Sequence, residues 1–151
     1  MKRPFFLYLL FLLHLFLGLG AIYGGGMLAL EPDGSLLGMD TEWLGDVPFN
    51  TYLIPGFFLF TLIGFLPLLT FVGLLLKPEW EWADTFNIYA NKHWAWTYSL
   101  YSGIIVIIWI TIQQVLTQYF WLQPVMTFTG LLIVIFTLTP QVIKNFEIYE
   151  H

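Results

Sequence analysis

Four long apolar stretches alternate with polar segments along this chain, at roughly residues 5–27, 52–76, 96–119 and 123–142. A helix rises ~1.5 Å per residue, so about 20 apolar residues are enough to cross ~30 Å of hydrocarbon. Each stretch has about the 20 residues that a membrane span needs. The pattern therefore predicts an all-α polytopic membrane protein, a four-transmembrane-helix bundle that forms a single domain over residues 1–151.

The charged residues predict the orientation of these spans. Two basic residues precede the first span, two lie between the second and third, and one follows the fourth: Lys2, Arg3, Lys77, Lys92 and Lys144. The linker at 28–51 carries only acidic charges: Glu31, Asp33, Asp40, Glu42 and Asp46. Because Lys and Arg collect in cytoplasmic segments, we expect both termini (N-in/C-in) and the 77–95 loop to be cytoplasmic, and 28–51 to be an external acidic loop. The apolar run at 5–22 is longer than the core of a secretory signal, so we expect a retained helix.

Composition excludes several functional classes. The chain is 58% hydrophobic and 10% charged, whereas soluble domains carry about 25% charged residues. Five scattered basic residues do not form a phosphate-binding stripe, so no nucleic-acid partner is expected. The absence of cysteine excludes thiol catalysis and Cys-ligated clusters. The acidic loop lacks the spacing of an EF-hand, and no hydrolase, metalloprotease or nucleotide signature occurs, so we predict no metal and no cofactor.

One ionisable side chain, His14, lies deep within a predicted span. It follows the start of that span by about nine residues, or ~14 Å at the helical rise, which is near the midplane. A polar group at this depth is costly unless it is paired or faces a cavity. The imidazole is therefore either a neutral hydrogen-bonding group between helices or part of a ligand pocket. A proton relay or a bis-histidine haem would need a second such group, and no predicted span supplies one.

The third predicted span carries a polar strip on its outer half. Trp109, Gln113 and Thr117 are spaced i, i+4 and i+8, and Gln114 lies beside them. Glutamine in lipid needs a hydrogen-bonding partner or a water-filled recess, so the strip is expected to face the bundle interior. It is either a set of helix-to-helix contacts or an outward-opening ligand pocket. The candidate pocket residues are His14, Tyr52, Trp109, Gln113, Gln114 and Gln123.

Glycine and proline predict local features of the first two spans. Gly20 and Gly24 form a G-x-x-x-G pair, which lets another helix approach closely, although a glycine-rich end can also simply fray. Pro67 lies in the middle of the second span and is expected to kink it, because proline lacks the N–H of the helical ladder.

Several short motifs carry a resemblance: Pro32-x-Gly34-x-x-x-Gly38-Met39, Pro48-Phe49, Ile54-Pro55-Gly56, Trp109-Ile110-x-x-Gln113 and Leu122-Gln123-Pro124. Together they resemble a group of small four-span bacterial membrane proteins that have no assigned activity. This resemblance implies a location in the bacterial cytoplasmic (inner) membrane. The chain is more loosely similar to sterol-isomerase-type four-helix membrane bundles, which use acidic residues and histidine in a cavity. It departs from them because no Asp or Glu lies within a predicted span.

Small predicted loops and aromatic, glycine-rich helices suit a chain whose partners are other spans. We therefore expect a non-enzymatic accessory or scaffold subunit of a larger membrane assembly, with membrane lipids and other subunits, or further copies of itself, as partners. The alternative is a binder or converter of a lipophilic small molecule, such as a quinone, an isoprenoid or a lipid, in the outer pocket around Gln113 and His14.

Overall fold

The computed structural model describes residues 4–31, 53–116 and 122–148. These residues form helices joined by turns, and no strand occurs among them apart from one isolated bridge between Lys92 and Glu147. The helices are α1 (Phe5–Leu30), α2 (Leu53–Phe58), the π-helix η3 (Leu59–Phe65), α3 (Leu66–Leu76), α4 (Glu81–Asp84), α5 (Trp94–Leu116), α6 (Leu122–Thr137) and α7 (Pro140–Asn145). Most of the predicted external loop at 28–51 lies outside the described residues.

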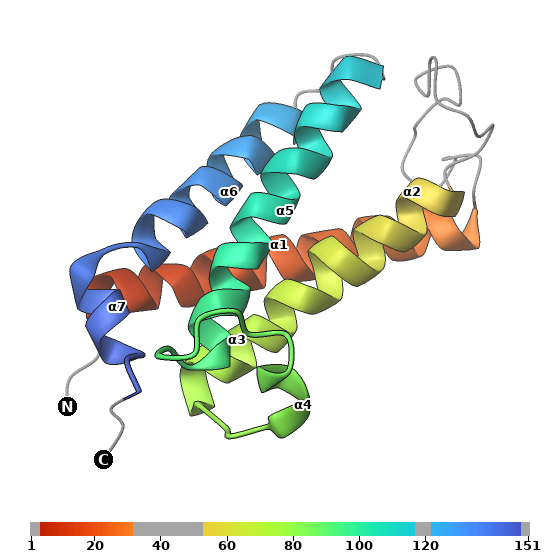
Figure 1. Cartoon of the computed structure of the whole chain (residues 1–151). Coiled ribbons are helices and arrows are strands. Elements are labelled where there is room, and N and C mark those ends of the chain that lie inside the picture. The colour runs from red at the N-terminus through yellow and green to blue at the C-terminus, as the bar shows by residue number, and fades with distance from the viewer. Residues whose placement is uncertain (1–3, 32–52, 117–121, 149–151) are drawn as a thin grey trace.

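The long helices pair two by two. Helix α1 runs beside the continuous segment α2–η3–α3, and α5 runs beside α6 (Figure 1). The two pairs cross where α1 meets α6 and α3 meets α5. Because the pairs cross at an angle, a residue partway along α1 can lie beside the first turns of α5. This crossing determines which residues of α5 lie beside His14.

Helix α1 presents a buried stripe to the rest of the bundle. Its members recur at alternating spacings of four and three residues: Leu7, Phe11, His14, Gly18, Ala21, Gly25 and Leu28. This spacing is that of a helix packing lengthwise against neighbours, with the side chains of each turn meeting the facing helices. His14 is thus one position of the core stripe.

The closest helix contacts are made at glycines other than the predicted pair. A Cβ added at Gly25 would lie 2.6 Å from the Gly56 carbonyl oxygen, and one at Gly18 would lie 3.0 Å from that of Gly64. At Gly20 the described chain places nothing within 4 Å, and Gly24 makes only an ordinary contact with a leucine side chain. Gly20 is exposed and lies outside the buried stripe, so the predicted Gly20 and Gly24 pair is not where the described helices approach most closely.

Pro67 changes the helical pitch of the second span. The preceding residues Leu59–Phe65 form a π-helix, and Pro67 lies at the start of α3. The backbone N–H of Leu66 bonds to the carbonyl of Thr61, five residues earlier. Because proline removes an N–H and its ring crowds the preceding turn, the wider turn accommodates it while the segment stays helical. The irregularity expected at Pro67 is therefore a run of π-helix.

The last predicted span, 123–142, is divided in two. Helix α6 ends at Thr137, and the short helix α7 begins at Pro140. Thr139 before the proline is extended, at φ −65° and ψ 141°. A residue preceding proline is sterically pushed out of the helical region, which explains why the helix ends here.

Three helical segments are long and apolar enough to cross a membrane, namely Phe5–Leu28, Gly56–Leu76 and Trp94–Gln113. The apolar segment Gln123–Thr137 is shorter. All four carry large apolar side chains on their outer surfaces, among them Leu12 and Phe16 on α1, Phe65 on η3, Ile108 on α5, and Phe128 and Ile135 on α6. Soluble monomers rarely expose such continuous apolar surface. The outer surface therefore fits a lipid environment.

Candidate functional site

A chain of buried polar side chains joins three helices. His14 of α1 places its ring Nε2 at 2.9 Å from the hydroxyl of Ser99 on α5. The Ser99 hydroxyl lies 2.7 Å from that of Thr137 on α6, and Thr137 donates to the carbonyl of Ile133 at 2.6 Å. The three side chains have no exposed surface. We call this set the His14–Ser99–Thr137 chain.

The hydrogen-bond pattern assigns the proton of the imidazole. Nδ1 of His14 is buried and has no hydrogen-bond partner among the described residues. A buried N–H without an acceptor is rarer in proteins than an acceptor without a donor, so the proton belongs on Nε2. His14 then donates to Ser99, Ser99 donates to Thr137, and Thr137 donates to the Ile133 carbonyl. With the bonds running in this direction, each N–H or O–H donor of the His14–Ser99–Thr137 chain has an acceptor.

The His14–Ser99–Thr137 chain lies near the α5 start and the α6 end. Ser99 is in the second turn of α5, and Thr137 is the last residue of α6. His14 therefore lies beside the second turn of α5, at the level of Ser99, and the two helix pairs cross at an angle (Figure 1). The imidazole makes the hydrogen bond between helices that one of its two expected roles requires.

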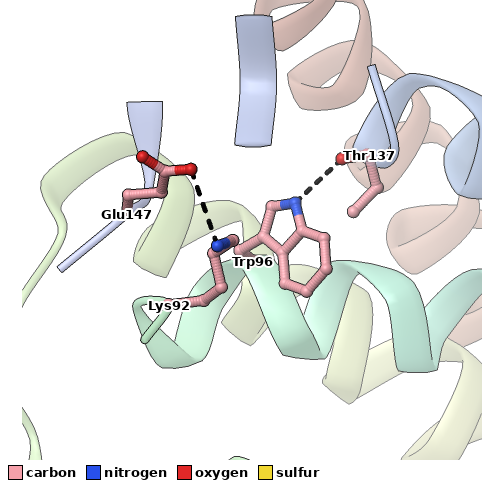
Figure 2. A network of polar contacts seen from close by, with 4 residues as sticks. All are labelled: Lys92, Trp96, Thr137 and Glu147. Carbon is pink, nitrogen blue, oxygen red and sulfur yellow. Dashed lines mark hydrogen bonds and ion pairs between the residues drawn. The ribbon is translucent and has the colours of Figure 1, made fainter. Parts of the chain in front are cut away.

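The carbonyl of Thr137 extends this arrangement towards the surface. It accepts a 2.8 Å hydrogen bond from the indole Nε1 of Trp96 (Figure 2). The ammonium of Lys92 lies 6.0 Å from the centre of the Trp96 ring and 3.8 Å from the carboxylate of Glu147. Figure 2 shows that the tail after α7 and the start of α5 are held together here.

Further contacts tie the tail to the loop between α3 and α5. Lys77 donates to both the backbone and the side-chain oxygen of Asn145, at 2.7 Å each, and its ammonium lies 4.5 Å from the ring centre of Phe146. The N–H of His93 donates to the Phe146 carbonyl at 2.8 Å. The ring of Phe6 stacks on that of Phe136 at 5.2 Å. The start of α1, the α3–α5 loop and the tail are therefore at one end of the molecule.

His93 caps the start of α5. Its Nδ1 accepts from the N–H of Ala95 at 3.1 Å, and its Nε2 is 3.0 Å from the Pro78 carbonyl, to which it donates. Accepting at the second helical N–H is the usual role of an N-cap side chain. Burial lowers the pKa of His93 below its usual value of 6.5, and the positive charge of Lys77 lowers it further. The neutral ring is the form that this site stabilises.

Gln113, one of the residues predicted to form an outer pocket, is placed apart from His14. Ser99, the partner of His14, precedes Gln113 by fourteen residues of the same helix, which is about 21 Å along its axis. Trp109 lies on the C-terminal half of α5 beside Phe58 of α2, with ring centres 6.1 Å apart. Gln113 is half-buried and Gln123 is buried. Tyr52 and the side chain of Gln114 lie outside the described part of the chain.

Trp109 carries one unusual feature. Its indole Nε1 is buried and finds no acceptor among the described residues. A buried N–H without an acceptor costs about 1–3 kcal/mol. The group is therefore available to an acceptor that reaches it.

Ser99 is the interior residue that the sequence reasoning missed. It is one of several small residues on the buried side of α5, with Ala95, Ser102 and Gly103. Small and hydroxyl residues concentrate where membrane helices pack, and this signal could have identified it. Threonines of α6 also bond within their own helix, since Thr127, Thr129 and Thr137 each donate to the carbonyl four residues earlier.

The geometry defines a helical protein with three segments suited to crossing a membrane and a polar interior that joins its helices. No protein-family model matches the chain, and searches of the curated proteins and of the solved structures give no match.

Proposed function

We propose that this chain is a small non-enzymatic accessory or scaffold subunit of a larger membrane assembly in the bacterial inner membrane. The observation that carries the proposal is the use of the interior polar groups. His14, Ser99 and Thr137 are fully buried and bond to one another, so they join α1, α5 and α6 and present no atom to a substrate. An interior whose polar groups bond to one another supports a structural role for the chain, as a rigid part of an assembly.

The outer face of α1 supports a partner helix. Large exposed side chains follow one side of this helix: Phe5, Tyr8, Leu12, Phe16, Leu19 and Tyr23. Gly20 lies among them with nothing of the described chain within 4 Å of its Cβ position. Gly20, which the described helices leave open, thus remains available to a helix of another chain, where small residues allow close approach, while Gly24 beside it contacts Leu59.

The proposed topology has four spans, with both termini and the 77–95 loop in the cytoplasm. Lys77 and Lys92 contact the tail at Asn145 and Glu147, so the described basic side chains of the loop share one end with the tail. The positive-inside tendency assigns that end to the cytoplasm. Helix α6, with 16 residues, would be the fourth span.

The test uses a photo-reactive amino acid at Leu19, beside Gly20, with Phe128 on α6 as the control, since both side chains are strongly exposed. After irradiation in membranes and gentle detergent extraction, we expect a discrete adduct with a second membrane protein, or with a second copy, only from position 19. Gly20→Leu should abolish the adduct and leave stability unchanged. A monomer that gives no adduct, or an adduct indifferent to Gly20→Leu, would contradict the proposal.

A second candidate function follows from Trp109. Its buried N–H has no acceptor among the described residues, and Gln113 is one helical turn away. This pair supports a binder of a lipophilic molecule with a carbonyl oxygen, such as a quinone or an ester lipid. Native mass spectrometry should then show a bound molecule that is lost in Trp109→Phe, which keeps an aromatic ring and removes the N–H. The exposed Trp82→Phe serves as the control, and equal retention in both variants would refute this candidate.

A further inference from the structure

The segment between α3 and α5 folds back along α5. The Tyr98 hydroxyl donates to the carbonyl of Ala83 at 2.6 Å, and the Tyr101 hydroxyl donates to that of Phe86 at 2.9 Å. The Thr97 hydroxyl donates to the side-chain oxygen of Asn87. Side chains of a helix lean towards its N-terminus, so these bonds hold the segment beside the first turns of α5. The apolar stretch of that helix, Trp94–Gln113, begins at this level.

This segment exposes both apolar and acidic side chains. Trp82, Phe86 and Ile88 are 55%, 67% and 73% exposed, and we call these three residues the apolar edge. Acidic side chains of the same segment are also exposed: Glu79, Glu81 and Asp84. Part of the backbone is satisfied locally, since the N–H groups of Asp84, Thr85 and Asn87 donate to carbonyls three or four residues earlier. A backbone that satisfies itself can lie at the edge of the hydrocarbon region.

Aromatic stacking anchors the apolar edge to the bundle. The indole of Trp82 stacks on that of Trp80, and Trp80 stacks on Trp94, with ring centres 5.5 Å apart in each pair. The Trp94 indole is buried and donates to the Pro78 carbonyl at 2.8 Å. The exposed ring of Trp82 is thus the end of a stack fixed in the protein.

We propose that the apolar edge inserts into the headgroup–acyl boundary of the bilayer that surrounds the protein, so that the α3–α5 segment lies in the membrane surface. Three observations support a lipid occupant. The tyrosine bonds place the segment at the level where the apolar stretch of α5 begins, and Leu76, at the end of α3 where the segment begins, is 69% exposed. Aromatic side chains beside acidic ones suit a region that is apolar on one side and wet on the other.

Single spin labels test this directly, because the chain has no cysteine of its own. A nitroxide is attached to Phe86→Cys or Ile88→Cys, and the purified protein is placed in phosphatidylcholine vesicles without any partner. Collisions with oxygen, which concentrates in lipid, are compared with collisions with a water-soluble nickel chelate. Glu79→Cys and Asp84→Cys are the matched controls at exposed acidic positions of the same segment.

We expect oxygen collisions to exceed nickel collisions at 86 and 88 and the ratio to invert at 79 and 84. Adding Tyr101→Phe removes the hydroxyl that holds Phe86, so the oxygen preference at 86 should fall while a label at the outward-facing Leu12 keeps its value. Nickel collisions at 86 and 88 equal to those at 79 would overturn the proposal and leave a protein partner as the occupant. Immobilised labels that neither reagent reaches would overturn it too, since they would lie within the protein.

Discussion

Replacing Ser99 by alanine removes the middle of the His14–Ser99–Thr137 chain. The change leaves the Nε2 N–H of His14 buried with no acceptor, because Ser99 is its bonding partner and the side chain has no exposed surface. Thr137 loses one contact but keeps its bond to the Ile133 carbonyl. An unsatisfied buried donor costs about 1–3 kcal/mol, whereas interhelical hydrogen bonds in membranes average about 0.6 kcal/mol. We therefore expect Ser99→Ala to lower the free energy of unfolding by about 1–2 kcal/mol.

Ser102→Ala is the matched control on the same helix. Ser102 is buried like Ser99, but its hydroxyl donates to the carbonyl of Tyr98 within its own helix, and its oxygen is 3.5 Å from that of Thr70. A bond of this kind contributes little to stability. Reversible unfolding in mixed detergent micelles should separate the two variants. His14→Leu combined with Ser99→Ala should recover most of the loss, because both polar partners are then gone. Equal losses for Ser99→Ala and Ser102→Ala would refute the reasoning.

Three further predictions address other contacts. Gly25→Ala should destabilise the bundle by about 1–3 kcal/mol through overpacking, because the new methyl group would lie 2.6 Å from backbone atoms of the facing helix. Gly20→Ala is the control, and it should leave the thermal midpoint in detergent unchanged. Trp96→Phe removes the donor to the Thr137 carbonyl, and hydrogen exchange at the end of α6 should quicken; unchanged protection would count against this bond. The pKa of His93 in the folded protein is below the value of 6.5 that applies to the unfolded chain. As pH falls below 6.5 the unfolded chain therefore takes up a proton more readily than the folded protein, and stability should be lost. His93→Asn, which keeps a capping side chain, should flatten the dependence between pH 8 and 5 in thermal unfolding, and an unchanged slope would refute it.

The helices could be predicted from the sequence because their signal is local. Runs of apolar residues fix the first three helical segments to within a few residues, and the described helices Phe5–Leu30 and Trp94–Leu116 start near the predicted bounds. The end of α6 was harder to predict from the sequence, because the apolar run continues to 142 and only the proline at 140 marks the break. The π-helix before Pro67 depends on how one irregular turn is packed, which composition does not specify.

The interior contacts could not be predicted because they depend on how the helices cross. His14 was identified by its type and depth, but its partner Ser99 is 85 residues away in sequence, and neither carries a motif. The choice between Gly18 and Gly20 depends on which face of α1 is turned inward, and a span that is apolar on all sides gives no such signal. The predicted grouping of His14 with Gln113 assumed that similar polarity implies proximity, whereas the crossing helices separate them.

The most direct test of the four-span topology is a measurement of the side of the membrane on which each loop lies. Single cysteines are introduced at Glu79, Glu147 and Glu42 into a chain that has none, and intact cells are treated with a thiol reagent that does not cross the inner membrane. We predict labelling at position 42 in intact cells and at positions 79 and 147 only after the membrane is permeabilised. Labelling of 79 and 147 from opposite sides, or of either one together with 42, would contradict the four-span bundle and the proposals that depend on it.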